Sequence, residues 1–240
     1  MLIVLTTVVF VSCKKVYKIG DIGPAGGYIF YDCDADNNSG NADGLKSSKC
    51  GWRYLEAAPA DIRVLNGVPT VDSTKTDQLK DMADIVGFIP RFGIYRKSSD
   101  GSSLYVNGKA SYSSSDCTGT EIGTGKKNTD LLVKAMGDSA YQLNKGTETT
   151  SIYAAKLCSD LKYNGFEDWF LPSRDELNLL YVNLHNANLG DFEDGRENTY
   201  WSSSESSSDI KSVWVQSFVR GEQDGRARQS RYKVRAVRAF

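Results

Sequence analysis

Strand-like stretches at both ends of this 240-residue chain, with helical patterns between them, set the tightest limit on its fold. Residues 26–32 follow a Pro-Ala-Gly-Gly turn and carry the aromatic and β-branched side chains typical of a strand. Residues 52–56 indicate a second strand, which ends before Pro59. Towards the other end, residues 213–218 alternate between one apolar and one mixed face, and residues 234–240 close the chain as a strand. This order predicts an α+β domain.

The clearest helix begins at Ser173 with the capping box Ser173-Arg-Asp-Glu176. Its apolar residues recur at the spacing of one helix face: Leu177, Leu180, Tyr181 and Leu184. Weaker helical stretches cover residues 131–136, opened by Asn128-Thr-Asp130, and residues 151–163. Residues 60–127 show only weak signals and contain long Ser-, Gly- and Asp-rich stretches, so we expect a loop-rich insertion there.

The N-terminal segment is typical of a lipoprotein export signal. Residues 1–12 form an uncharged apolar run, shorter than the roughly 20 residues that span a bilayer. A small residue, Ser12, precedes Cys13, and the chain then turns polar at Lys14-Lys15. We therefore interpret residues 1–12 as a signal peptide, Cys13 as the lipid-bearing residue and residues 13–25 as a tether. The alternative is a buried N-terminal strand.

Four further cysteines favour disulfide bonds, because an even number in an exported chain normally pairs. Three connectivities are open. We expect Cys33 to pair with Cys50 across a polar, Gly- and Asn-rich loop whose composition could not order itself. We then expect Cys117 to pair with Cys158. Free buried thiols are the alternative, and a metal site is disfavoured because no Cys-x-x-Cys spacing occurs and His185 is the single histidine.

The distribution of charge along the chain suggests that one local surface, and not the whole protein, favours anions. The formal net charge is −1, so nothing favours a nucleic-acid partner. The C-terminal stretch is nevertheless rich in basic residues: Lys211, Arg220, Arg226, Arg228, Arg231, Lys233, Arg235 and Arg238. Such a surface suits carboxylates, sulfates and phosphates, and Trp214 and Tyr232 could stack on a sugar ring. A solvated hairpin whose charges only maintain solubility is the alternative.

Catalytic motifs are missing from the sequence. It contains no His-Glu-x-x-His, no Gly-x-Ser-x-Gly elbow and no second histidine. The segment 123–127 resembles part of a phosphate-binding loop, but Thr120 and Lys127 stand where Gly and Ser or Thr are required. The Asp-rich residues 32–40 resemble a calcium loop, but Ser39 and Leu45 stand where that loop requires Gly and Glu. We therefore expect no enzyme, cofactor or metal.

Five ordered segments of the chain carry a resemblance to a known family. They are IGDIGPAGGYIFY (19–31), GWRYLEAAP (51–59), NGFEDWFLPSRDEL (164–177), YWSSSE (200–205) and VRAVRAF (234–240). Together they resemble the C-terminal domain of the Legionella collagen-like adhesin, a bacterial domain family otherwise of unknown function. The resemblance implies a C-type-lectin-like domain over residues 26–240, with paired N- and C-terminal strands, flanking helices and long loops.

The same resemblance assigns roles to single residues. It implies that Trp52, Trp169 and Trp201 belong to the core and that Glu205 anchors a loop through hydrogen bonds. The sequence lacks the Glu-Pro-Asn or Gln-Pro-Asp triplet of calcium-dependent lectins. By analogy with relatives that bind ligands near the C-terminus, the candidate ligand-binding face consists of Trp214, Gln216, Arg220, Glu222, Gln223, Asp224, Arg226, Arg228 and Arg231.

These observations lead us to expect an exported, adhesin-like surface lipoprotein, anchored to the cell envelope at the outer membrane or cell surface. Its ligand would be a glycan or another anionic molecule, or an envelope or host protein. The alternatives are a structural envelope protein with a protein partner and, with less support, an unrecognised hydrolase.

Overall fold

The first and the last strand of the described residues lie in one antiparallel sheet. The computed structural model describes residues 15–35, 51–65, 67–71, 90–94, 118–143, 147–192 and 198–240. Strands β1 (Tyr28–Asp32) and β10 (Val237–Ala239) each pair with β2 (Tyr54–Ala57), which gives the sheet order β1-β2-β10. The resemblance implied that the first and last strands pair with each other. That expectation is corrected, because β2 lies between them.

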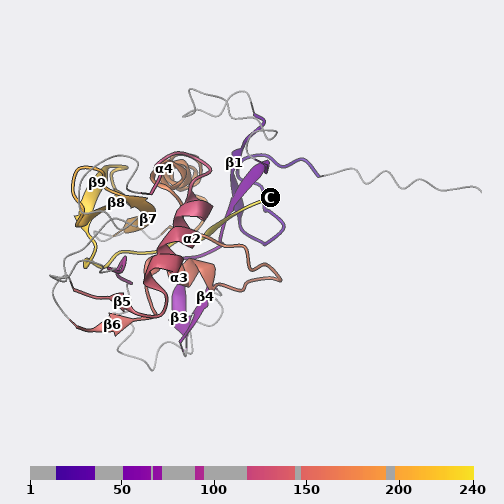
Figure 1. The fold of residues 1–240 in the computed structure, drawn as a ribbon. Coiled ribbons are helices and arrows are strands. Elements are labelled where there is room, and N and C mark those ends of the chain that lie inside the picture. Colours follow the sequence, from indigo (N-terminus) through magenta and orange to yellow (C-terminus); the bar gives the residue numbers. More distant parts are fainter. Residues whose placement is uncertain are drawn as a thin grey trace, which may run out of the picture.

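A second three-stranded sheet comes from the last part of the chain. It contains β7 (Thr199–Glu205), β8 (Ser212–Ser217) and β9 (Gln223–Ala227), in the antiparallel order β7-β8-β9. The sequence predicted β8 from its alternation, but it predicted no strand at β9, which lies in the polar and basic C-terminal stretch. Figure 1 shows this sheet at one side of the molecule, with β1 and the C-terminus at the other.

Helices and short hairpins fill the space between and beside the sheets. The helices are α2 (Gly125–Met136), α3 (Ala154–Ser159), α4 (Arg174–Asn183) and the short 3-10 helix η3 (His185–Ala187). The hairpins are β3 (Arg63–Leu65) with β4 (Val68–Thr70), and β5 (Ala140–Tyr141) with β6 (Thr149–Thr150). Helix α4 contacts β1, β7 and β8, so it joins the two sheets. The predicted α+β class is confirmed.

Two hydrophobic clusters form the core. Trp169 and Trp201 lie in one of them and are almost completely buried, as expected. Trp52 is only partly buried and packs against the second cluster, which contains the apolar face of α4 and the inner side of β1. No helix in the described ranges is both long and apolar enough to cross a membrane.

Three arginines of the C-terminal stretch are buried as ion pairs. The pairs are Arg228–Glu205 at 2.8 Å, Arg235–Asp61 at 2.7 Å, Arg238–Glu56 at 3.1 Å and Arg238–Asp168 at 2.9 Å. Taking a charge out of water is costly unless a partner charge and hydrogen bonds satisfy it. These arginines therefore connect distant parts of the chain instead of facing solvent.

The cysteine predictions have mixed outcomes. Cys158 is a free thiol buried in the core, so the predicted Cys117–Cys158 disulfide is wrong. Burial in apolar surroundings raises the pKa of this thiol well above its ordinary value. Cys33 is disulfide-bonded, but the other end of that bond lies outside the described residues. The predicted signal peptide and Cys13, Cys50 and Cys117 also lie outside them.

Candidate ligand-binding face

The first turn of α4 fixes the geometry of the candidate face. Ser173 Oγ accepts a hydrogen bond from the Glu176 amide at 3.3 Å, and the Ser173 amide donates to Glu176 Oε2 at 2.7 Å. This is the capping box that the sequence predicted. The Gly123 amide donates to the other carboxylate oxygen at 2.8 Å. An amide that a phosphate-binding loop would offer to its ligand is thus bonded to Glu176.

The Glu176 carboxyl is closed off from solvent. Its side chain is buried, and burial raises its pKa to about 7, although bonds from the backbone amides of Ser173, Gly123 and Gly125 favour the ionised form. A Cβ atom at Gly125 would lie 2.2 Å from Glu176 Oε2, so only glycine fits there. Glu176 therefore holds the loop before α2 against α4 and cannot itself touch a ligand.

Arg174 and Trp214 form the most distinctive pair next to this turn. The Arg174 guanidinium carbon lies 5.2 Å from the centre of the Trp214 ring, a cation–π distance. Arg174 Nε donates to Asp175 Oδ1 at 2.8 Å, yet the Arg174 side chain remains 30% exposed. Trp214 is half-buried. A partly exposed aromatic ring beside a forked donor offers both apolar stacking and hydrogen bonds to one ligand.

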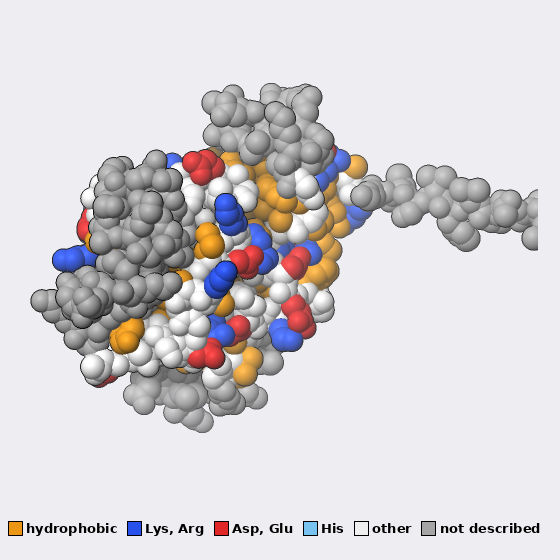
Figure 2. All heavy atoms as spheres, viewed as in Figure 1, with side chains coloured by type: hydrophobic (Ala, Val, Ile, Leu, Met, Phe, Trp, Pro, Cys, Tyr) orange, Lys and Arg blue, Asp and Glu red, His pale blue; other side chains and the backbone are white. Residues whose placement is uncertain are grey.

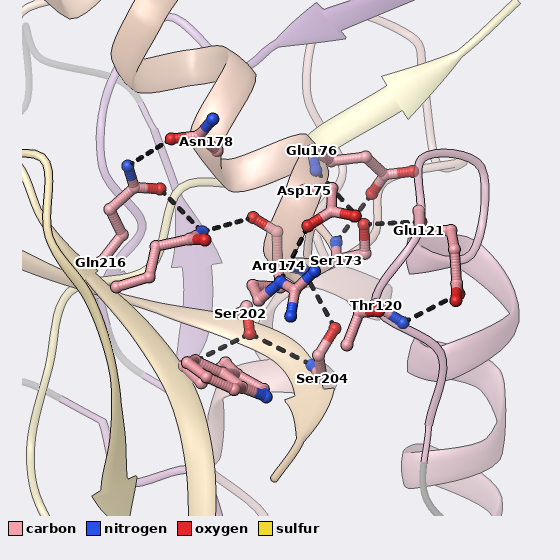
Figure 3. Close-up of polar contacts among 12 residues, drawn as sticks. Thr120, Glu121, Ser173, Arg174, Asp175, Glu176, Asn178, Ser202, Ser204 and Gln216 are labelled. Atoms are coloured by element: carbon pink, nitrogen blue, oxygen red, sulfur yellow. Dashed lines mark hydrogen bonds and ion pairs between the residues drawn. The ribbon is translucent and has the colours of Figure 1, made fainter. Parts of the chain in front are cut away.

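A chain of hydrogen bonds holds this pair in place (Figure 3). Gln223 Nε2 donates to the Arg174 carbonyl at 2.8 Å and to Gln216 Oε1 at 3.2 Å. Gln216 Nε2 in turn donates to Asn178 Oδ1 on α4 at 2.8 Å. On the other side, the Arg174 amide donates to Ser204 Oγ at 3.0 Å. Side chains of β7, β8 and β9 are therefore bonded to α4, and Arg174 and Trp214 sit on a preorganised support.

The exposed part of the predicted face lies on β9 and the turn before it. Asp224 and Arg226 point to solvent and form an ion pair at 2.9 Å. Arg220 and Glu222, in the turn between β8 and β9, are also exposed. Arg231 is exposed but lies beyond β9 and the turn after it, where it forms an isolated β-bridge with Arg91. An exposed pair of this kind adds little stability, so Asp224 and Arg226 can leave their ion pair for a ligand at small cost.

Two predicted face residues lie inside the domain. Gln216 is fully buried in the network that leads to α4. Arg228 is also fully buried; besides its ion pair with Glu205, its Nε donates to the Ile210 carbonyl at 2.9 Å. Glu205 additionally accepts from the Thr118 amide at 3.1 Å, which confirms its expected role as a loop anchor. We therefore remove Gln216 and Arg228 from the face.

The expected basic surface is also corrected. Burial removes Arg228, Arg235 and Arg238 from it. The exposed basic residues that remain in the stretch are Lys211, Arg220, Arg226 and Arg231. Exposed Asp209 precedes them in the sequence, and exposed Glu222 and Asp224 lie among them. The charge of this surface is therefore mixed. Shape and aromatic stacking distinguish the candidate site more than positive charge does.

Arg174, Asn178 and Ser204 were not predicted as part of the site. A signal for Arg174 was present in the sequence, because it occupies the first position of a helix, where a cation opposes the helix dipole. A residue type that is unfavourable for the helix itself points to another role. Asn178 and Ser204 carried no such signal, since their partners come from distant segments.

Metal binding finds no support in the part of the chain that the structure describes. No group of three or more His, Cys, Asp or Glu side chains gathers there. Asp32 and Asp34, from the Asp-rich run, lie 3.0 and 3.5 Å from Arg53 Nε. The guanidinium thus occupies the position next to these carboxylates.

A family model described as the Lcl C-terminal domain matches residues 117–238. The matched region contains α2, α3, α4, the β7-β8-β9 sheet and the Arg174–Trp214 pair. No curated protein matches the chain.

Proposed function

Because this chain belongs to the Lcl C-terminal domain family, we propose that it is an adhesin-like binding module displayed at the cell surface. It is non-catalytic and is exported as a lipoprotein through the signal in residues 1–12, with Cys13 carrying the lipid. Its scaffold is C-type-lectin-like, and its ligand is a glycan. A function of this kind needs a rigid, partly exposed recognition surface more than it needs reactive groups.

The observation that carries the proposal is the Arg174–Trp214 pair on its hydrogen-bonded support. A tryptophan ring presents a flat apolar surface to the ring of a sugar, and a guanidinium donates to hydroxyl or carboxylate oxygens. The Arg174 carbonyl accepts a hydrogen bond from Gln223 and the Arg174 amide donates one to Ser204, and these bonds hold the pair, so little ordering is required on binding. Asp224 and Arg226 extend the exposed polar rim along β9.

Glu176 is a poor candidate for hydrolytic chemistry, despite its raised pKa. A general acid must reach the atom that it protonates within hydrogen-bond distance. Its oxygens already accept from the amides of Gly123 and Ser173, and the side chain is buried. These contacts favour a binding module over the hydrolase alternative.

The test is binding to an array of neutral, sialylated and sulfated glycans at low and physiological salt. We expect Trp214→Ala and Arg174→Gln to weaken binding, whereas Trp214→Phe, which keeps an aromatic face, should retain more of it. The control is Lys162→Gln, which removes an exposed cation bonded to Glu167, away from this face in sequence.

Wild-type affinity in both Trp214→Ala and Arg174→Gln would overturn the assignment of the site. Wild-type protein that binds no glycan at either salt concentration would overturn the glycan ligand and favour a protein partner. A steep loss of affinity with salt would show that an anionic group of the ligand dominates.

A further inference from the structure

The segment that follows the predicted lipid anchor is fixed to the domain. The Tyr17 amide donates to the Tyr54 hydroxyl at 3.1 Å, and the Tyr17 ring packs edge-on against Tyr54 and Phe240. The Gly20 amide donates to the Ile29 carbonyl at 2.8 Å, and Ile29 bonds back to Asp21. Residues from Tyr17 onward are thus part of the folded domain, and the expected tether of residues 13–25 is shorter than predicted.

This attachment limits how far the domain can stand from a membrane. Three residues lie between Cys13 and Tyr17, and the four residue-to-residue steps that join these two positions span at most about 14 Å when fully extended. The polar layer of a bilayer is itself roughly 5 to 8 Å thick on each side. A lipid on Cys13 would therefore hold Tyr17 and the residues after it at or near the headgroups.

The surface that would meet the headgroups has the composition of an interfacial segment. Three of the eight exposed large hydrophobic side chains of the described ranges occur within one short stretch: Val16 at 64%, Ile19 at 39% and Ile22 at 50% exposed. Exposed Lys15 and Lys18 accompany them, against the single acid Asp21. Figure 2 shows hydrophobic side chains gathered on the side of the molecule that carries β1 and the C-terminus.

We propose that residues 15–22 form a membrane-docking surface, which seats the domain directly on the bilayer that holds its lipid anchor. This inference rests on the proposed lipidation of Cys13. Val16, Ile19 and Ile22 enter the headgroup region, and Lys15 and Lys18 lie beside lipid phosphates. The seated domain then has a fixed orientation, with the β7-β8-β9 sheet on the side away from the membrane (Figure 1).

Fluorescence quenching tests the docking with a matched pair of variants. Ile22→Trp places a reporter in the proposed surface, and Val68→Trp places one at a similarly exposed position, 61% against 50%, in the β3–β4 hairpin. Each full-length lipidated protein is reconstituted into vesicles of phosphatidylethanolamine and phosphatidylglycerol, brominated near the glycerol end of the acyl chains. The native tryptophans contribute the same background to both.

We expect the added fluorescence of Ile22→Trp to be lost in brominated vesicles, with no loss in Val68→Trp. Equal quenching of the two variants would overturn the docking surface. A mass spectrum showing no acyl chain on Cys13 would overturn it too, by removing its premise. Glycan binding is measured separately on the same variants, so docking can hold even if the ligand proposal fails.

Discussion

At the scale of single residues, the charges of the C-terminal stretch divide into structural and solvent-facing groups. Arg228 and Arg226 are two positions apart, yet the first is buried against Glu205 and the second lies on the exposed edge of β9. Alternation along a strand would place both side chains on the same face; Arg228 differs because β9 ends at Ala227 and the chain turns there. The charge pattern of the sequence alone does not distinguish them, because whether each arginine is buried depends on an acidic residue elsewhere in the chain.

Removing one partner of the buried pair should destabilise the protein strongly. Arg228→Ala leaves the Glu205 carboxylate without its 2.8 Å partner, and breaking such pairs typically costs about 3–5 kcal/mol. Arg226→Ala, at an exposed ion pair, should cost less than about 1 kcal/mol. The free energy of unfolding by urea measures both, and equal losses in the two variants would contradict the structural role of Arg228.

The pH dependence of the free energy of unfolding should reveal the raised pKa of Glu176. Its pKa rises from 4.5 in the unfolded chain to about 7 in the fold, so its stabilising contribution is complete below pH 4.5. The contribution is lost as the pH rises towards 7, because the unfolded chain releases the proton first. The slope from one such group is at most about 1.4 kcal/mol per pH unit.

The comparison of wild type with Glu176→Gln isolates this effect, since Glu56 also has a raised pKa and contributes in the same direction. We expect the stability difference between the two proteins to change between pH 5 and pH 7 and to level off above pH 8. Parallel pH profiles would show that the Glu176 pKa is not shifted.

At the scale of elements, the sequence predicted those helices and strands that are determined by capping and by local hydrophobic periodicity. The helix at Ser173 was predictable because the capping box and the apolar stripe agree, and both capping hydrogen bonds are present. Strand β9 was not, because an edge strand with Gln, Asp, Gly and Arg lacks an apolar face and is defined by its pairing with β8. Helix α2 begins at Gly125, before its apolar residues, where the contact with Glu176 requires a glycine.

Close strand packing makes a sharp prediction for Gly27. A Cβ atom there would lie 1.7 Å from the Ala57 carbonyl oxygen, so Gly27→Ala must push β1 away from β2. We expect a loss of stability well beyond the ~1 kcal/mol of an average substitution. Gly225→Ala is the control, because its nearest contact is an ordinary 3.6 Å, and it should change stability by less than about 0.5 kcal/mol. Thermal unfolding of both variants tests this prediction. Similar melting temperatures for the two would contradict the close packing of Gly27 on Ala57.

At the scale of the whole molecule, the candidate site could be predicted only in part. Its position near the C-terminal strands and the involvement of Trp214 followed from the sequence and its family resemblance. Arg174 joins the site because α4 packs on the second sheet, and the loss of Arg235 from the surface depends on Asp61, 174 positions earlier. Contacts over such separations are set by the folded topology and leave no local pattern.

The first and last strands of the domain belong to one sheet, and this arrangement has a practical consequence for experiments in living cells. Strand β10 and β1 flank the same central strand, and Phe240 packs on Tyr17 next to the start of the domain. A fluorescent reporter fused after Phe240 would emerge on the side proposed to face the lipid. Its bulk would keep residues 15–22 from reaching the bilayer surface. Such a fusion could export and fold normally and still mislead about how the protein is displayed.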